Sequence, residues 1–93
     1  MLENFLKKYK TSAVKIFYDM RSFSSVRVGE VCTIVDMLND DKKINVRLCE
    51  LGLVEGQKAQ IVSKSLLKKV CLVEVLGYRF CVRTSLLKDV IVL

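Results

Sequence analysis

The sequence predicts a small, mainly β domain with short helices, and three observations lead to that prediction. The chain has 93 residues, which is the length of one domain. Apolar residues make up 52% of it, which is enough for a folded core. From Val26 onward, short runs rich in β-branched residues alternate with polar or glycine-containing turns. We expect about five short antiparallel strands, and such strands usually close into a small barrel because closure removes exposed edges.

The first residues have a different pattern, that of an amphipathic helix with a basic polar face. Residues 1–23 hold five basic and two acidic side chains, a net of +3, and the remainder holds eleven and eight, also +3. We therefore expect an N-terminal helix and linker over 1–23, with the serine-rich stretch Arg21–Ser25 as the linker. The apolar face would pack on the following domain, or alternatively contact a membrane surface or a partner protein. The apolar residues at helical spacing are Leu2, Phe5, Leu6, Tyr9, Ala13, Ile16, Phe17 and Met20.

The domain expected over 24–93 begins with a strand and a short helix. Val31–Leu38 is a β-rich run that follows a turn at Gly29. Asn39 or Asp40 would cap the helix that comes next, because short polar side chains accept the free N–H groups of a first turn. One face of this helix would consist of Ile44, Leu48 and Leu51.

The stretch RLCELGLVEGQ predicts how this helix turns into the next strand. If the helix ends just before Gly52, that glycine adopts a left-handed conformation. Leu53 would then make the hydrophobic contact of a Schellman motif with Leu48. Gly56 would complete a tight turn before the strand. Both glycines therefore have a structural use, and a ligand-binding loop is not needed.

The remainder predicts a β-meander with one late helical turn. Leu76–Tyr78 would reverse the chain, and Thr84 or Ser85 would cap the helical turn Ser85–Asp89. Strands are expected at 57–64, Val70–Leu76, Arg79–Arg83 and Val90–Leu93.

The residue types exclude most catalytic chemistry. The chain has no histidine, which removes Ser–His and Cys–His nucleophile systems and the H-E-x-x-H zinc site. The cysteines form no C-x-x-C pair, and no phosphate-binding or dinucleotide motif is present. We therefore expect no enzyme, no cofactor and no metal site. The dispersed cysteines are Cys32, Cys49, Cys71 and Cys81, which we interpret as small core residues.

The sequence also predicts a cytoplasmic protein. No run approaches the roughly 18 apolar residues of a membrane span. The N-terminus lacks the apolar core of a signal peptide.

Three motifs in the domain resemble the FeoA domain family. They are G-E-x-x-x-I-V from Gly29, R-L-x-x-L-G-L-x-x-G-x-x-A-x-I-V from Arg47, and G-Y-R-F-x-V-R from Gly77. The resemblance runs from Ser24 to Leu93 and implies an SH3-like barrel fold. Two positions depart from the family pattern: Glu55 stands where proline is usual, and Leu87 where alanine is usual. The N-terminal helix lies outside the resemblance.

The resemblance implies an accessory role in bacterial ferrous iron transport. FeoA-like proteins work with FeoB, a membrane transporter of ferrous iron with a cytosolic G-domain, by binding it rather than by catalysis. Similar domains end iron-dependent repressors, but no DNA-reading helix–turn–helix precedes the domain in this sequence. The family is also associated with transition-metal binding, which a chain without histidine supports poorly.

We expect the partner-binding surface to include Arg47, Leu53, Val54 and Arg83. Val54 follows a helix end, where an apolar side chain is hard to bury, whereas Leu53 would offer only an edge. Both arginines should reach solvent, and apolar residues ringed by arginine are typical of protein contact sites. Alternatively, the arginines simply form surface ion pairs with Asp40, Asp41 or Glu50.

A different class of function, a small basic barrel that binds nucleic acid, remains open. The pI near 9.3 and the lysine pairs Lys42–Lys43 and Lys68–Lys69 permit it. Base stacking requires exposed aromatic residues, however, and the barrel region offers only Tyr78 and Phe80. A steeply salt-dependent affinity for random nucleic acid would favour this alternative.

Overall fold

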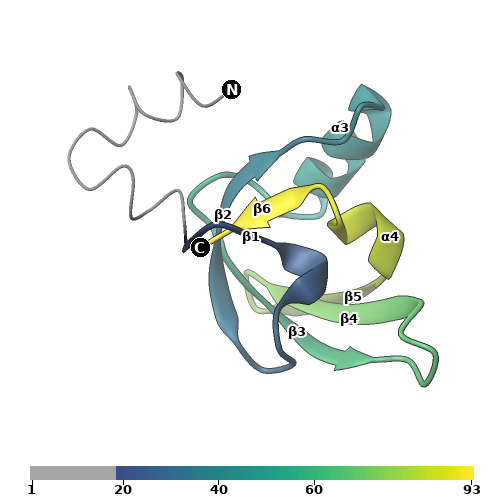
Figure 1. Cartoon of the computed structure of the whole chain (residues 1–93). Coiled ribbons are helices and arrows are strands. Elements are labelled where there is room, and N and C mark those ends of the chain that lie inside the picture. The colour runs from purple at the N-terminus through teal and green to yellow at the C-terminus, as the bar shows by residue number, and fades with distance from the viewer. Residues whose placement is uncertain (1–18) are drawn as a thin grey trace.

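A curved antiparallel sheet forms most of the computed structural model, which describes residues 19–93 (Figure 1). Its six strands lie in the order β1-β6-β2-β3-β4-β5. The strands are β1 (Arg21–Ser22), β2 (Val31–Met37), β3 (Lys58–Lys64), β4 (Val70–Val75), β5 (Tyr78–Arg83) and β6 (Val90–Val92). The short helices are η1 (Phe23–Ser25), α3 (Lys42–Glu50) and α4 (Thr84–Leu87). The mainly β prediction is thus confirmed, but the number of strands is six because the segment before the expected domain contributes β1.

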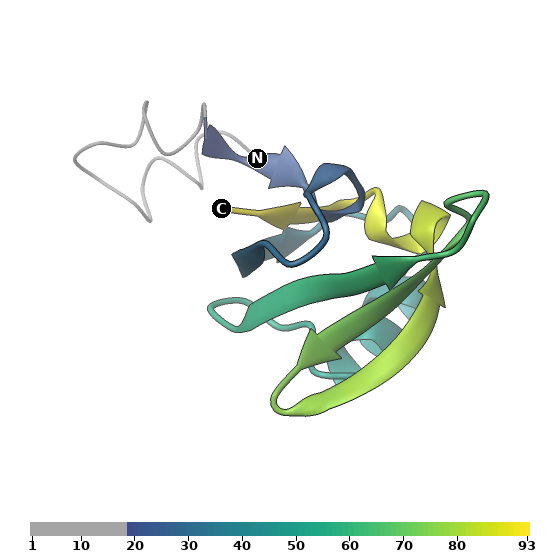
Figure 2. The same cartoon turned by 90° about the horizontal axis from the view of Figure 1, so that it is seen from below.

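Strand β2 belongs to both halves of the sheet. Its first residues pair with β3, where Val31 lies opposite Gln60, and its last pair with β6, where Met37 lies opposite Val90. The register shifts between Ile34 and Asp36, which is where a bulge bends the strand. The sheet therefore curls, and β1 and β6 lie over β3–β5 in both views (Figures 1 and 2).

The core fills the space inside this curled sheet. Alternating residues of the strands point inward, as the burial pattern of β4 shows, and no polar side chain among the described residues is buried. Helix α3 adds Leu48 and α4 adds Leu87. The fully buried large side chains are Phe23, Val26, Ile34, Leu53, Ile61, Val73, Val75, Leu87, Val90 and Val92.

The predicted linker at Arg21–Ser25 is wrong. Arg21 and Ser22 pair with β6, and Phe23 is 0% exposed in the core. The Ser22 hydroxyl donates to the Lys88 carbonyl at 2.7 Å, which fastens the segment to the end of α4. The serine content favours a flexible connection, but the burial of Phe23 stabilises the folded segment more than the serines favour disorder.

Two helix starts also differ from the prediction. Asp41, rather than Asn39 or Asp40, caps α3, and its carboxylate accepts the Lys43 N–H at 2.9 Å. Asn39 instead accepts the N–H of Asp41 at 2.8 Å and so shapes the approach to the helix. Helix α4 begins at Thr84 without a side-chain cap, so neither Thr84 nor Ser85 has the predicted role.

The predicted N-terminal amphipathic helix falls on residues 1–18, with its last turn reaching Met20, and residues 1–18 lie outside the described part of the chain. Within residues 19–93, no helix is long and apolar enough to cross a membrane.

Candidate partner-binding surface

Helix α3 ends in the Schellman motif that the sequence predicts. Gly52 has φ +103°, and its N–H donates to the Cys49 carbonyl at 2.9 Å. The Leu53 N–H donates to the Leu48 carbonyl at 3.1 Å, and both leucines are buried. Gly56, with φ +85°, completes the following turn, so the chain leaves the helix along a defined path.

The β4–β5 hairpin covers this helix end. A Cβ atom at Gly52 would lie only 2.9 Å from the Tyr78 hydroxyl and 3.2 Å from Leu76 Cδ1. The Tyr78 hydroxyl donates to the carbonyl of Leu51, the C-cap residue that follows α3. This hydrogen bond satisfies one of the free carbonyls of the helix end, and it ties α3 to the sheet.

Exposed apolar side chains gather where the helix end meets the hairpin. Val54 is 39% exposed, Leu76 60% and Tyr78 42%. Arg47 is exposed on the last turn of α3, where its carbonyl accepts the Leu51 N–H at 3.2 Å. We call the surface of Arg47, Val54, Leu76 and Tyr78 the α3 corner.

The structure keeps only part of the predicted surface together. Arg47 lies in the last turn of α3 and Val54 follows its end, whereas Leu53 is 0% exposed and has no surface to offer. Arg83 ends β5, and Tyr78, at the corner, begins it. The two residues are five positions apart along the strand, which is roughly 17 Å, so Arg83 lies away from the corner.

Arg47, the arginine of the α3 corner, forms no ion pair with another described residue. Within the described part of the chain, the ion pairs are Arg21–Glu30 and Arg79–Glu74, and neither Arg47 nor Arg83 takes part in one. Arg79 Nε lies 2.8 Å from Glu74 Oε1, and this hydrogen bond, with another from Gln60, lowers the pKa of the Glu74 carboxyl. The alternative that Arg47 and Arg83 pair with neighbouring acids therefore has no support among these residues.

The cysteines do not form a metal centre in the described residues. Cys32 and Cys71 are buried, whereas Cys49 and Cys81 are exposed, so the interpretation of all four as core residues is wrong for two of them. Residues 19–93 contain no group of three or more cysteine, aspartate or glutamate side chains placed to hold a metal ion. The absence of a metal site in the whole chain stays a prediction.

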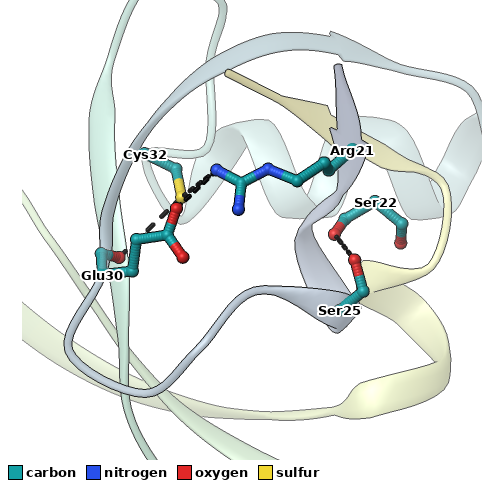
Figure 3. Close-up of polar contacts among 5 residues, drawn as sticks. All are labelled: Arg21, Ser22, Ser25, Glu30 and Cys32. Carbon is teal, nitrogen blue, oxygen red and sulfur yellow. Dashed lines mark hydrogen bonds and ion pairs between the residues drawn. The ribbon is translucent and has the colours of Figure 1, made fainter. Parts of the chain in front are cut away.

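Cys32 illustrates why a buried thiol of this fold is a poor ligand. Arg21 Nη2 lies 2.5 Å from Glu30 Oε2 and 4.0 Å from the Cys32 sulfur (Figure 3). Burial raises the pKa of the Cys32 thiol, and the nearby Glu30 carboxylate acts in the same direction. A thiol that resists ionisation binds metal weakly, because the thiolate is the ligand.

Two residues of the corner escaped prediction from the sequence, namely Leu76 and Tyr78. The sequence predicts a tight reversal at these residues, and the turn has Leu76 at φ +54° and Gly77 at φ +81°. A leucine at a left-handed turn position, where glycine or asparagine is usual, was the available signal. That the turn covers the end of α3 depends on tertiary packing, which no local pattern contains.

Known proteins resemble this chain in sequence and in fold. The FeoA domain, as a protein family, matches residues 21–93. The crystal structure of Stenotrophomonas maltophilia FeoA complexed with zinc is 31% identical, with a TM-score of 0.66 over 77% of this chain and 88% of that one. That protein is described as a prokaryotic SH3 domain protein and a candidate activating factor of bacterial ferrous iron transport. No curated protein matches the chain.

Other solved structures share the fold at lower identity. The FeoA-like protein of Clostridium acetobutylicum is 19% identical, with a TM-score of 0.72 over 80% of this chain and 85% of that one. A manganese-dependent transcriptional repressor is 12% identical, with a TM-score of 0.73 over 81% of this chain but only 36% of the repressor. The latter likeness is one of fold, and it concerns about a third of the repressor's length.

Proposed function

Because the chain belongs to the FeoA domain family, which is linked to ferrous iron transport, we propose that it is a non-enzymatic accessory protein of that process. It docks on the cytosolic part of an FeoB-type ferrous iron transporter. The chain has an SH3-like fold and works as a binding module, with the α3 corner as its contact surface.

The observation that carries the proposal is the exposure of apolar side chains at the α3 corner. Leu76 and Tyr78 are more than two-fifths exposed, although the neighbouring Gly52 and Leu53 are buried. The Schellman motif and the Tyr78 hydrogen bond hold these side chains in place before any partner arrives. A preorganised surface loses less conformational entropy when it binds, which favours affinity.

The chemistry of the corner suits a protein partner. Tyrosine and arginine are enriched in the energetically important parts of protein interfaces, and the corner combines Tyr78, Arg47 and aliphatic groups. An acidic or polar group of the transporter would pair with Arg47, while Val54 and Leu76 would enter an apolar pocket.

Titration of the purified protein with the transporter's cytosolic domain tests the proposal. Val54→Glu should weaken binding at least tenfold, because it places an unpaired charge in the contact. The matched control is Val28→Glu, since Val28 is 52% exposed but precedes β2 rather than following α3. Both variants are first compared with the unmodified protein by thermal unfolding.

Two results would contradict the proposal in different ways. Equal affinity of the Val54→Glu variant and the unmodified protein would exclude the α3 corner as the contact. Failure of the unmodified protein to bind the domain would exclude docking itself.

A further inference from the structure

Two leucines project from the turn between β3 and β4. Leu66 is 98% exposed and Leu67 is 74% exposed, the largest exposures among the apolar residues that the structure describes. The turn, Ser65–Lys69, extends beyond the body of the sheet in both views (Figures 1 and 2). We call Leu66 and Leu67 the tip leucines.

The turn that carries the tip leucines has a defined conformation. The Lys68 N–H donates to the Ser65 carbonyl at 2.8 Å, and the Ser65 N–H donates to the Val70 carbonyl at 2.8 Å. The Ser65 hydroxyl accepts the N–H groups of Lys69 and Val70, each at 3.1 Å. Lys68 adopts φ +57°, a left-handed conformation that helps to reverse the chain. The leucines are therefore held outward by an ordered backbone.

Positive charge surrounds the tip leucines. Lys68 and Lys69 are exposed in the turn itself, and Arg83 lies opposite Val70 in the β4–β5 register. No acidic residue occurs from Lys64 to Val73. Among the described residues, these three cations form no ion pair.

We propose that the β3–β4 turn inserts the tip leucines into the surface of an anionic lipid bilayer. The heads of Lys68, Lys69 and Arg83 would contact lipid phosphates, while the apolar stems of the lysines lie beside the leucines. The turn N–H groups that Ser65 satisfies would enter the interface without losing hydrogen bonds.

A lipid surface fits the turn better than a protein pocket does. Lysine is depleted in protein interfaces, and the turn contains lysine without any aromatic residue. Aliphatic side chains flanked by lysine are instead typical of segments that lie in a membrane interface. The inference goes beyond transporter docking, because it uses different residues. The turn and the α3 corner lie at opposite ends of β4, roughly 17 Å apart, so both surfaces are free at once.

A single tryptophan reports directly on insertion, because the chain contains none. Leu66→Trp keeps a large apolar side chain at the tip, and its indole N–H suits a membrane interface. Vesicles with about 30% phosphatidylserine in phosphatidylcholine should shift its fluorescence to shorter wavelength, and brominated lipid chains should quench it. Val28→Trp is the matched control, since Val28 is also an exposed apolar residue of a turn but lies outside both proposed surfaces. Its emission should stay at the wavelength seen in buffer.

Charge reversal tests the electrostatic part by vesicle sedimentation. The Lys68→Glu and Lys69→Glu double variant should lower binding at least tenfold, because each basic residue near an anionic surface contributes about fivefold. The Lys42→Glu and Lys43→Glu double variant changes the net charge equally at the start of α3 and should lower binding much less.

Several outcomes would overturn the proposal. Unshifted emission of the Leu66→Trp variant with bound vesicles would mean that another segment, such as residues 1–18, contacts the lipid. An equal loss of vesicle binding in the two double lysine variants would mean that binding depends on the net charge of the protein and not on the β3–β4 turn. A shift of the Leu66→Trp emission with the transporter's cytosolic domain, but not with vesicles, would assign the turn to a protein partner. None of these outcomes bears on Val54→Glu, so transporter docking succeeds or fails separately.

Discussion

Gly52 is the residue on which the α3 corner depends most. Its positive φ is required by the Schellman motif, and its missing side chain makes room for Tyr78 and Leu76. Gly56 shares the positive φ, but a Cβ atom added there would meet nothing within 4 Å. Alanine substitutions at the two glycines can therefore be compared, and the comparison separates the free-energy cost of backbone strain from that of steric crowding.

Gly52→Ala should lower the free energy of unfolding by about 2 kcal/mol or more, and Gly56→Ala by about 1 kcal/mol. Both alanines must adopt a left-handed backbone, but only the one at position 52 also displaces the Tyr78 hydroxyl from the Leu51 carbonyl. Urea unfolding of the two variants measures the difference. Equal urea midpoints of the two variants would show that the β4–β5 hairpin leaves room for a side chain at Gly52.

At the scale of elements, β1 and η1 show that the folded domain includes residues before Ser24. The segment Arg21–Ser25 has the composition of a linker, yet it adds an edge strand and buries Phe23. The family match from residue 21 agrees with a folded unit that begins at β1 rather than at Ser24. The edge strand is only two residues long, which limits pairing with other chains.

Phe23→Ala should destabilise the domain by about 3–5 kcal/mol, because it leaves a cavity beneath the sheet. Phe23→Leu, which keeps most of the apolar volume, should cost about 1.5 kcal/mol or less. Denaturant unfolding followed by circular dichroism measures both values. An unfolding curve of Phe23→Ala that matches the unmodified protein would restore the linker interpretation.

For the whole molecule, local sequence patterns predict most secondary-structure elements, but they do not predict how these elements pack together. The strand positions after Val26, α3 and the Schellman motif follow from alternation, helical spacing and glycine chemistry, and the structure has them. The sixth strand could not be predicted, because a two-residue strand contains no periodic signal. The sequence groups Arg83 with Val54 by chemistry, but it does not show that β5 places Arg83 away from the α3 corner.

The geometry of the α3 corner follows from the sequence in the same uneven way. Val54 and Arg47 are exposed, as their positions at and after a helix end suggested. The sequence predicts that Leu53 shows an edge, but the Schellman contact buries it completely. Leu76 and Tyr78 join the corner only because the β4–β5 turn packs on Gly52.

The most direct measurement of the central claim is a map of backbone amide signals by NMR, recorded as the transporter's cytosolic domain is added to the isotope-labelled protein. We expect shifts or broadening at Arg47, at Leu51–Val54 and at Leu76–Tyr78, because these amides belong to the α3 corner or adjoin it. Amides of the β3–β4 turn should stay unchanged, since the cytosolic domain presents no bilayer. Changes confined to that turn, or no changes at the α3 corner under saturating domain, would contradict the account.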